Sequence, residues 1–437
     1  MASFSIPLTG LEADSTALNT VANDLSNMNT TAFKAETTNF ADLFYQQIGS
    51  TGSGDPIELG AGVKVATNEI AFTQGSINST GNSTDVALNG PGFFVVSNGL
   101  GGYEYSRAGN FSVDTNGDLV TSNGLNVMGY PALAGVVNTN APLTAVNVPV
   151  GQVQEPQATA NMSMTANLDS TTAAGTPFPA EVTVYDSLGE PHTVTITFTA
   201  TAVANTWDYS ASLPTADYSA AGGNGAPAAI TGTMTFDQNG NLTAVAPASG
   251  VGGGTVGTGV GDVNSVDLNF NPLATNVLAD GAAGLDIQWN LMSAAGTPNI
   301  SQVDTESAVS GTIQDGYTSG QYNGFTVGSD GTVTATYSNG KQENVGQLAL
   351  ANVDNPQGLT LMGNGDYMIT EASGTAAVGT SGTAGLATIQ DDALEASNVN
   401  ISTEFSDLII AQRAFEANAK SVTTFDTVTQ DTINMVH

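Results

Sequence analysis

Helical periodicity is confined to the two ends of this chain of 437 residues, and this restricts the folds that it can adopt. Near the amino end, apolar side chains recur three, four or seven positions apart, which places them on one stripe of a helix. This first stripe consists of Leu11, Leu18, Val21, Leu25 and Met28. A second stripe, near the carboxyl end, consists of Phe405, Leu408, Phe415, Ala419 and Val422. We therefore expect one amphipathic helix at each end of the chain.

Residues that cap or break helices indicate where the two helices begin and end. The segment Thr9-Gly10-Leu11-Glu12 matches the capping-box pattern, which predicts that the first helix begins near Thr9. Segment 402–436 contains no Gly or Pro, and Ser402 is predicted to be its N-cap. At ~1.5 Å per residue, this second helix would be ~50 Å long.

The sequence between the two ends has the pattern of β-strands. Polar and apolar side chains alternate over residues 181–185 and 192–198. A unit made of an aromatic residue, an Asn-Gly or Asp-Gly turn and an aliphatic residue occurs three times, over residues 111–119, 236–242 and 325–333. Such a turn is the strongest local signal for a β-hairpin, so we expect three hairpins there.

The chain is strongly acidic, and its charge is unevenly distributed. Its net charge is −34, and its only basic residues are Lys34, Lys64, Arg107, Lys341, Arg413 and Lys420. No basic residue lies between positions 108 and 340, so we expect no binding of nucleic acid or of anionic membranes. A chain of this length is expected to form two or three domains, with glycine-rich loops or linkers at 250–262 and 372–385.

No targeting or membrane segment is expected. Residues 1–7 have neither the basic nor the apolar region of a secretory signal peptide, and no apolar run approaches the ~18 residues of a membrane span. The chain contains no cysteine, so redox chemistry is not expected. If the protein leaves the cell, we expect an export route that does not cleave such a signal.

The sequence contains no recognisable set of catalytic or metal-binding residues. The two histidines, His192 and His437, lack the neighbours that a zinc site or a catalytic triad requires. Segment 114–118 weakly resembles a calcium loop, but Leu125 stands where the bidentate glutamate would be, so a plain turn is favoured. We predict no catalytic residue, no cofactor and no metal site. An enzyme with an unmarked pair of carboxylates stays as a minor alternative.

The two terminal stripes need a partner, because a short amphipathic helix is marginal in water by itself. The stripes could cover each other and close over one ordinary domain. They could also be covered by other copies of the chain, which would make the ends of the chain an assembly interface. The pattern alone leaves both alternatives open.

Two terminal motifs resemble those of the flagellar rod and hook family. The first, over residues 18–34, joins the aliphatic stripe to an Asn-rich stretch and an aromatic-Lys pair. The second, over residues 394–418, joins a Ser-Asn-Val turn to a helix that carries Gln-Arg-Ala-Phe. The residues in these two motifs that carry the match are Asn23, Asn27, Phe33, Lys34, Ser397, Asn398, Val399, Gln412, Arg413 and Ala414.

Segments between the terminal motifs are similar to the first β domain of the same family. They lie at 88–96, 105–111 and 118–124, and residues 347–359 resemble the part of that domain that returns later in the chain. The matching residues are Gly90, Gly92, Phe93, Phe94, Arg107 and Gly109. Residues from about 146 to 300 match nothing beyond a general β pattern.

The resemblance implies a mixed fold, in which terminal α-helices form a coiled-coil-like layer beside two mainly β domains that are nested in sequence. The helical layer would comprise 1–35 and 395–437, facing a central channel. The first β domain, which forms the tube wall, would comprise 71–145 and 300–372. The inserted outer β domain would comprise 146–299, and linkers would comprise 36–70 and 373–394.

The resemblance also implies a structural and non-enzymatic function. Rod members of the family are generally shorter and lack a large inserted domain, so the length favours a hook subunit, which polymerises into a curved tube between motor rod and filament. Implied partners are other copies of the chain, the distal rod protein, the hook cap, the hook-filament junction protein and the flagellar type III export apparatus, with the tube outside the cell. The alternatives are a distal rod protein and an acidic surface-layer or adhesin protein.

Overall fold

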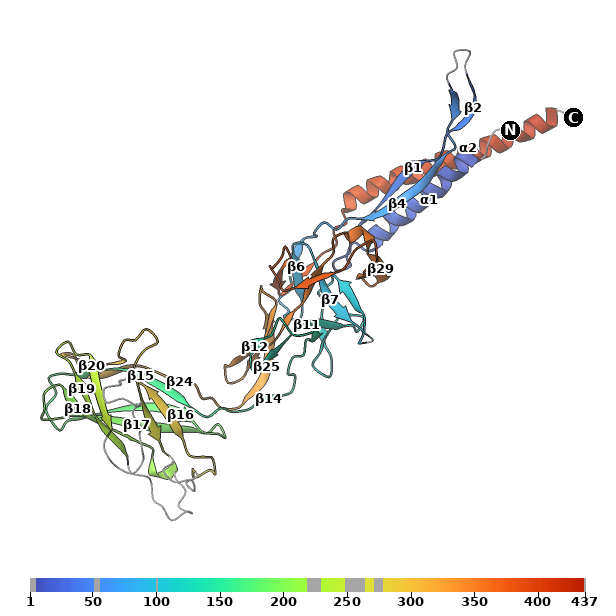
Figure 1. The fold of residues 1–437 in the computed structure, drawn as a ribbon. Helices are drawn as coiled ribbons and strands as arrows, with labels where there is room; N and C mark the ends of the chain where they lie inside the picture. Colours follow the sequence, from blue (N-terminus) through green and yellow to red (C-terminus); the bar gives the residue numbers. More distant parts are fainter. Residues whose placement is uncertain are drawn as a thin grey trace. The chain divides into compact units, whose positions relative to one another are not determined.

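The computed structural model describes residues 5–50, 56–99, 101–217, 229–247, 264–270 and 278–435. These residues form mostly β-sheet with one long helix near each end of the chain, as the periodicity predicted (Figure 1). The chain divides into two compact units, which we call unit 1 and unit 2. Unit 1 holds residues 1–150, 323–336 and 342–437, and unit 2 holds residues 151–322 and 337–341. His437 and the glycine-rich segment at 250–262 lie outside the described residues.

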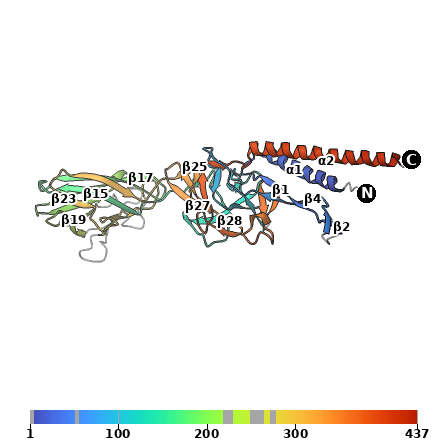
Figure 2. The same cartoon turned by 90° about the horizontal axis from the view of Figure 1, so that it is seen from above.

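The two helices belong to unit 1 and pack side by side (Figures 1 and 2). Helix α1 spans Ser5–Ser26, and helix α2 spans Ile401–Met435. The predicted start of α1 near Thr9 is wrong, because Thr9 lies inside the helix and its hydroxyl donates to the Ile6 carbonyl. The predicted cap at Ser402 is also wrong, because the carboxamide oxygen of Asn400 accepts the N–H of Ser402 at 3.0 Å.

Two β-ribbons follow α1 in the segment expected to be an extended linker. Strand β1 (Glu36–Asp42) pairs antiparallel with β4 (Val63–Ile70), and β2 (Gln46–Ser50) pairs with β3 (Pro56–Leu59). The β1–β4 ribbon packs against α1, where the hydroxyls of Thr38 and Thr20 lie 3.0 Å apart. The ribbon therefore gives α1 a second neighbour besides α2.

The β domain of unit 1 is built from two stretches that are far apart in sequence. Along its sheet the strand order is β26 (Thr332–Tyr337), β27 (Gln342–Leu348), β11 (Asn126–Leu133), β7 (Phe93–Ser97), β8 (Tyr103–Ser106), β30 (Asp366–Met368) and β29 (Thr360–Gly363). All five residues of β7 are buried, as expected of a strand that is covered on both faces. Short strands β12 (Val136–Val137) and β13 (Thr144–Ala145) pair with β11.

The chain returns to the helices through strands that pair with the start of this domain. Strand β33 (Ala393–Glu395) pairs with β5 (Ile77–Ser79), β32 (Thr388–Asp391) with β6 (Val86–Asn89), and β31 (Ala377–Gly379) with β28 (Leu350–Asn352). Residues 373–394, expected to be a linker, thus include paired strands. These pairings bring the carboxyl end of α1 and the amino end of α2 together.

Unit 2 contains two five-stranded sheets that share one apolar core. The first has the order β16 (Pro177–Tyr185), β17 (Pro191–Ala200), β18 (Thr206–Ser212), β19 (Ile230–Phe236) and β20 (Leu242–Pro247). The second contains β21 (Ser265–Asn269), β22 (Asp286–Asn290), β15 (Asn161–Asp169), β23 (Ile300–Val303) and β24 (Ala308–Gln314). The ring of Trp289 in the second sheet contacts Tyr209 and Phe198 in the first, with centroids 5.8 and 6.1 Å apart.

The three predicted hairpins are present. Strand β9 (Ser112–Val113) pairs with β10 (Leu119–Val120), β19 pairs with β20, and β25 (Gly320–Val327) neighbours β26. Strand β25 also pairs with β14 (Val153–Gln154). The turn glycines Gly117, Gly240 and Gly331 have φ values of 89, 80 and 88°, a region that favours glycine. No described helix is both long and apolar enough to span a bilayer.

Candidate assembly site

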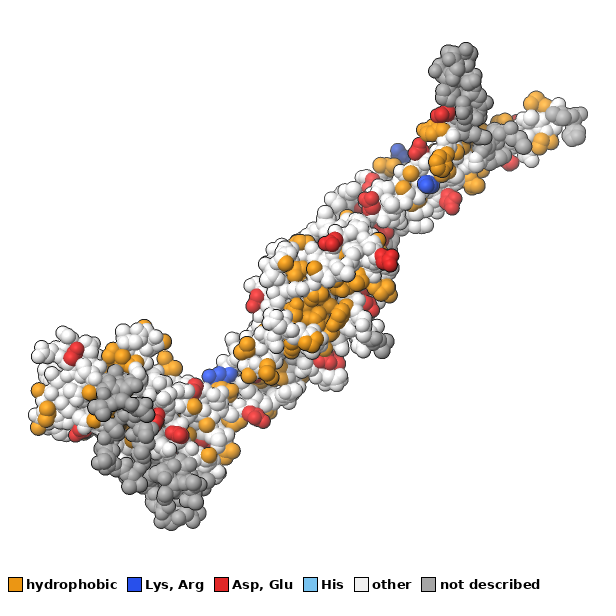
Figure 3. All heavy atoms as spheres, in the orientation of Figure 1, with side chains coloured by type: hydrophobic (Ala, Val, Ile, Leu, Met, Phe, Trp, Pro, Cys, Tyr) orange, Lys and Arg blue, Asp and Glu red, His pale blue; other side chains and the backbone are white. Residues whose placement is uncertain are grey.

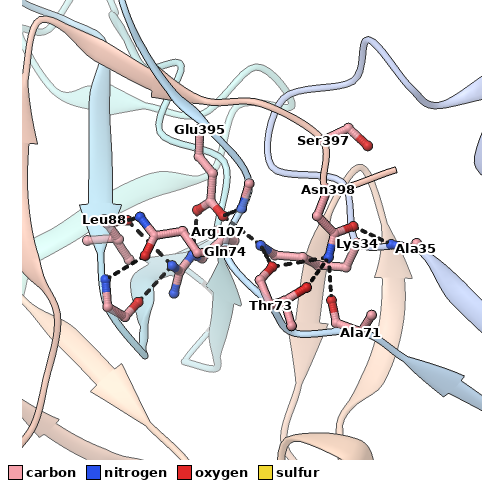
Figure 4. A network of polar contacts seen from close by, with 12 residues as sticks. Lys34, Ala35, Ala71, Thr73, Gln74, Leu88, Arg107, Glu395, Ser397 and Asn398 are labelled. Carbon is pink, nitrogen blue, oxygen red and sulfur yellow. Dashed lines mark hydrogen bonds and ion pairs between the residues drawn. The ribbon is translucent and has the colours of Figure 1, made fainter. Parts of the chain in front are cut away.

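A buried ion cluster joins the segment after α1 to the segment before α2 (Figure 4). Glu395, at the end of β33, accepts Lys34 Nζ on Oε1 at 2.6 Å and Arg107 Nε on Oε2 at 2.7 Å. Lys34 Nζ also donates to the carbonyl of Thr73 at 2.9 Å. All three charged side chains are at least 94% buried, so their charges are stabilised by one another in place of water.

The charges of this cluster shift each other's protonation. Burial by itself would raise the pKa of Glu395, but the charges of Arg107 and Lys34 outweigh it and hold the pKa below its usual value. Burial lowers the pKa of the Lys34 ammonium, and Glu395 partly opposes this. The cluster therefore binds the two ends of the chain through charged groups that water does not reach.

The remaining hydrogen bonds of Arg107 explain the glycines of the first β domain. Its Nη1 donates to the carbonyl of Gly92 at 2.6 Å, and its Nη2 donates to the carbonyl of Gly90 at 2.7 Å. Gly90 and Gly92 have φ values of 116 and 131°, which a side chain would oppose. A β-carbon on Gly109 would lie 1.7 Å from the Val86 carbonyl oxygen. Glycine is thus favoured at positions 90 and 92, whose carbonyls accept from Arg107, and at position 109, which lies against Val86.

Asn398 forms the second connection between the ends. Its Oδ1 accepts the N–H of Ala35 at 2.8 Å, and its Nδ2 donates to the carbonyl of Ala71 at 2.7 Å and the hydroxyl of Thr73 at 3.0 Å. Ser397 accepts the N–H of Val399 on its hydroxyl at 3.3 Å. We call Lys34, Thr73, Arg107, Glu395 and Asn398 the terminal junction.

The two phenylalanines after Gly92 fill opposite sides of β7, because successive strand residues alternate between faces. Phe93 contacts Tyr367 with ring centroids 5.4 Å apart, and Phe94 contacts Phe111 with centroids 5.0 Å apart. These family-motif residues are therefore core residues that support the terminal junction.

The contact between α1 and α2 uses small and polar residues. The buried residues of α1 are Pro7, Gly10, Ala13, Thr20 and Asp24. A β-carbon on Gly10 would lie 2.7 Å from Nδ2 of Asn418, so glycine permits close approach of the helices. Asn418 also donates to the carboxylate of Asp14 at 2.8 Å.

The ten apolar residues of the two predicted stripes are not fully buried. Met28, Phe405 and Phe415 are exposed. The others are half-buried, namely Leu11, Leu18, Val21, Leu25, Leu408, Ala419 and Val422. Further apolar side chains of α2, including Ile409 and Ile410, are 49 and 65% exposed. Hydrophobic side chains are visible at the surface along the helix pair in Figure 3.

An acidic groove of about 310 Å³ lies between α1, β1 and α2. Its apolar lining includes Val21, Phe40 and Ile410. Its carboxylates are those of Asp14, Glu36, Glu404 and Asp407. Burial and the neighbouring Asp407 charge raise the pKa of Glu404 above its usual value. The groove therefore gathers like charges beside apolar surface.

Asp24 is a buried carboxylate that the sequence did not reveal. It is fully buried at the end of α1, where its Oδ2 accepts the N–H of Glu36 at 2.8 Å and its Oδ1 has no partner. Burial raises the pKa of Asp24 to about 7, with repulsion from Glu404 adding to the effect and the Glu36 hydrogen bond opposing it. The carboxyl group therefore changes charge near neutral pH.

The other family-motif residues lie around the helices. Nδ2 of Asn27 donates to the backbone carbonyl of Asn23 at 2.9 Å, and both residues line a cavity of about 510 Å³ together with Phe33. Gln412 and Arg413 are exposed on α2, whereas Ala414 is half-buried and lines the groove. The structure thus brings Lys34, Arg107 and Asn398 together and leaves Gln412 and Arg413 on the surface.

Glu395 was missed as a site residue, although one signal pointed to it. Lys34 and Arg107 are two of only six basic residues, and both belong to the matched family motifs. A buried cation needs a carboxylate partner. Glu395 directly precedes the Ala-Ser-Asn segment of the carboxyl-terminal motif and is therefore the acidic residue next to the matched residues.

Three family models match the chain. They are described as "Flagellar basal body protein FlaE D2 domain", over 152–317, "Flagellar basal body rod FlgEFG protein C-terminal", over 390–435, and "Flagellar hook protein FlgE/F/G D1 domain", over 87–167.

Relatives that align over nearly their whole length are also flagellar hook proteins. The flagellar hook protein FlgE of Salmonella typhimurium is 32% identical, with 99% of this chain and 100% of the relative covered. That of Treponema pallidum is 31% identical, with 98% of each chain covered. The crystal structure of the Helicobacter pylori flagellar hook protein FlgE2 matches with a TM-score of 0.52 at 13% identity, over 73% of this chain and 100% of that one, which shows similarity of fold.

Proposed function

The chain belongs to the flagellar hook protein family and is a structural subunit of the hook, and from this premise we propose that its helix pair is the surface through which subunits join. The observation that carries this proposal is the exposure of apolar residues on α2. A stable single domain would cover such residues. A neighbouring copy of the chain supplies the cover here.

The directions of these residues indicate more than one neighbour. Phe405, Ile410 and Phe415 are five residues apart, which is about 140° around a helix of 3.6 residues per turn. Helix α1 covers only one side of α2. A helix that is apolar on several sides is typical of a helix that is buried on several sides. Helices of at least two other copies would therefore surround α2.

We infer a layered tube from this arrangement. Helices α1 and α2, within the segments 1–35 and 395–437 expected to be the helical layer, form a coiled-coil-like layer at the channel. The first β domain forms the wall, and the inserted β domain lies outside. The expected boundary between them at residue 300 was wrong, because β23 and β24 pair with β15 and residues 300–322 belong to unit 2. The terminal junction supports this division, because it anchors both helices to the β domain of unit 1 through buried charges.

The same layering explains how a hook can bend while it transmits torque. Helices that pack through apolar residues keep a firm inner layer, whereas outer domains with polar surfaces can exchange wet contacts as the tube rotates. The described surface of unit 2 carries carboxylates and the single lysine Lys341, so like charges on neighbouring copies repel each other. We infer that export uses the flagellar type III apparatus, and that partners are the distal rod protein, the hook cap and the hook-filament junction protein.

Replacement of Ile410 by aspartate tests the proposed interface. The change adds a charge to a side chain that is 65% exposed, so the folded monomer should tolerate it. Polymer recovered by sedimentation should fall at least tenfold, because a buried charge in the interface is costly. Val203→Asp is the matched control, since Val203 is 66% exposed in unit 2. Equal polymer yields for the two variants would rule out the helix interface.

Electron microscopy of the sedimented material checks the form of the polymer. A hollow tube agrees with a hook, whereas a flat lattice would support the surface-layer alternative. The acidic groove and the acidic unit 2 should repel the same surfaces of neighbouring copies. Salt screens this repulsion beyond about 8 Å at physiological ionic strength, so polymer yield should rise as salt is raised from a low concentration. Polymer yield that does not change with salt would contradict this role of repulsion.

A further inference from the structure

A histidine of unit 2 lies between carboxylates, in contrast to the prediction from the sequence. His192 stands at the start of β17 and is 7% exposed. Its Nδ1 lies 3.0 Å from Oδ2 of Asp217, and its Nε2 lies 3.3 Å from Oδ2 of Asp186. The expectation that His192 lacks the company of a metal site was wrong, because turns of the fold bring Asp217 and Asp186 to both sides of the ring.

A third carboxylate completes the cluster. Ligand atoms of Asp186, His192 and Asp280 all lie within 4.8 Å of one another. Asp186 is fully buried, and its Oδ1 accepts the N–H groups of Leu188 and Glu190, each at 2.9 Å. These two bonds hold the carboxylate so that Oδ2 is directed at the imidazole. Asp280 is exposed, so the cluster is open to solvent on one side.

The geometry around the imidazole fits a metal ligand. A neutral imidazole has one N–H, and a hydrogen bond to Asp217 places it on Nδ1. The lone pair of Nε2 then faces an oxygen lone pair of Asp186, which is unfavourable unless a proton on Nε2 or a metal cation lies between them. Tetrahedral zinc with ligands at about 2.0–2.1 Å separates any two of them by about 3.3 Å. The Nε2 to Oδ2 distance is 3.3 Å.

Asp217 has the position of an orienting partner. Histidines that bind metals usually donate their other ring N–H to a carboxylate, which fixes the tautomer and the ring. The Nδ1 to Oδ2 distance of 3.0 Å matches this arrangement. A mixed set of imidazole and carboxylates favours zinc-class ions over calcium or magnesium, which prefer oxygen alone.

We propose that Asp186, His192 and Asp280 bind one divalent cation of the zinc class, with Asp217 as the positioning residue and water as the remaining ligand. The ion would tie the β16–β17 turn to the turn at 278–282, and Asp217, in the short 3₁₀ turn Thr215–Asp217, would be held to the same centre. The site goes beyond the hook function, because it concerns the stability of unit 2 and does not require assembly.

Calorimetric titration of Zn²⁺ into the chelator-treated full-length monomer tests the proposal, in excess Mg²⁺ to occupy the acidic surface. We expect one site per chain. Asp280→Asn should weaken binding at least tenfold, and Asp217→Asn by about 10–100-fold. The matched control is Asp286→Asn, because Asp286 is exposed in the same unit but lies outside the cluster. At a free concentration 100 times its dissociation constant, Zn²⁺ should raise the unfolding temperature of unit 2 by about 5–10 °C.

Nuclear magnetic resonance of the histidine rings tests the site in the unaltered chain, which has only two histidines. One equivalent of Zn²⁺ should shift the His192 ring signals and leave those of His437 unchanged. Equal binding by Asp280→Asn and Asp286→Asn would mean an adventitious ion only and would overturn the proposal. His192 signals that do not change with Zn²⁺ and that show an imidazolium held between carboxylates would also overturn the proposal.

Discussion

Replacement of Asp24 by asparagine is expected to remove a penalty that high pH places on the folding of unit 1. The Asp24 carboxyl is fully buried between α1 and β1, with one oxygen unpaired and Glu404 nearby. Burial raises its pKa from 3.8 to about 7. Between these two values the folded chain holds a proton that the unfolded chain has lost. The stability of unit 1 therefore falls as pH rises through this window and levels off above it.

The size of the effect follows from the two pKa values. Each unit of difference corresponds to about 1.36 kcal/mol. For pKa values of 3.8 and about 7, the free energy of unfolding should drop by about 2.5 kcal/mol between pH 5 and pH 8. Asparagine does not titrate, so the wild type should lose this amount relative to Asp24→Asn over the same interval.

The chain supplies separate probes for its two units. Both tryptophans, Trp207 and Trp289, lie in unit 2, whereas the long helices lie in unit 1. Urea unfolding followed by circular dichroism therefore reports the helices, and tryptophan fluorescence reports unit 2 as an internal control. Asp42→Asn is the matched variant, because Asp42 is an exposed carboxylate on β1.

The difference between wild type and Asp24→Asn isolates this one group from all other titrations. A difference in the free energy of unfolding that stays constant from pH 5 to pH 8 would refute the reasoning. So would a pH dependence that Asp42→Asn removes equally well. A change confined to the tryptophan signal would place the effect in the wrong unit.

Three further outcomes are expected. Glu395→Gln should lower the stability of unit 1 by about 3–5 kcal/mol in urea unfolding, because two buried cations lose their carboxylate partner. The control variant Glu69→Gln changes an exposed carboxylate and should not lower the stability of unit 1. Gly109→Ala should lower the free energy of unfolding by about 3 kcal/mol in the same measurement, since the new β-carbon would overlap a carbonyl oxygen. The β-carbon of the control variant Gly102→Ala meets open space, so this variant should lose less than about 0.5 kcal/mol. Gly10→Val should separate α1 from α2, seen as faster hydrogen exchange in both helices, because its side chain would occupy the place of Asn418.

Much of the secondary structure could be predicted because it depends on local signals. The terminal helices follow from apolar spacing, and the three hairpins follow from Asn-Gly and Asp-Gly turns. The helix starts were wrong for a local reason as well. Thr9 resembles a cap, but the helix continues before it, and Asn400 provides a hydrogen bond that Ser402 was expected to provide.

The contacts of the buried polar groups could not be predicted, because they depend on how separate segments fold against one another. Glu395 meets Lys34 from 361 residues away and Arg107 from 288 residues away. The burial of Asp24 depends on how β1 folds back onto α1, and the carboxylates around His192 arrive from separate turns. No periodicity encodes these encounters, so the terminal junction and the histidine cluster emerge only from the fold.

Labelling of single cysteines before and after assembly tests most directly whether neighbouring copies cover α2. The natural chain has no cysteine, so Ile410→Cys and Val203→Cys each carry one reactive thiol. Both positions are about equally exposed in the single chain, at 65 and 66%. On polymerisation, the labelling rate of the thiol at position 410 should fall at least tenfold while that at position 203 changes little. Equal rates at position 410 in monomer and polymer would contradict the account.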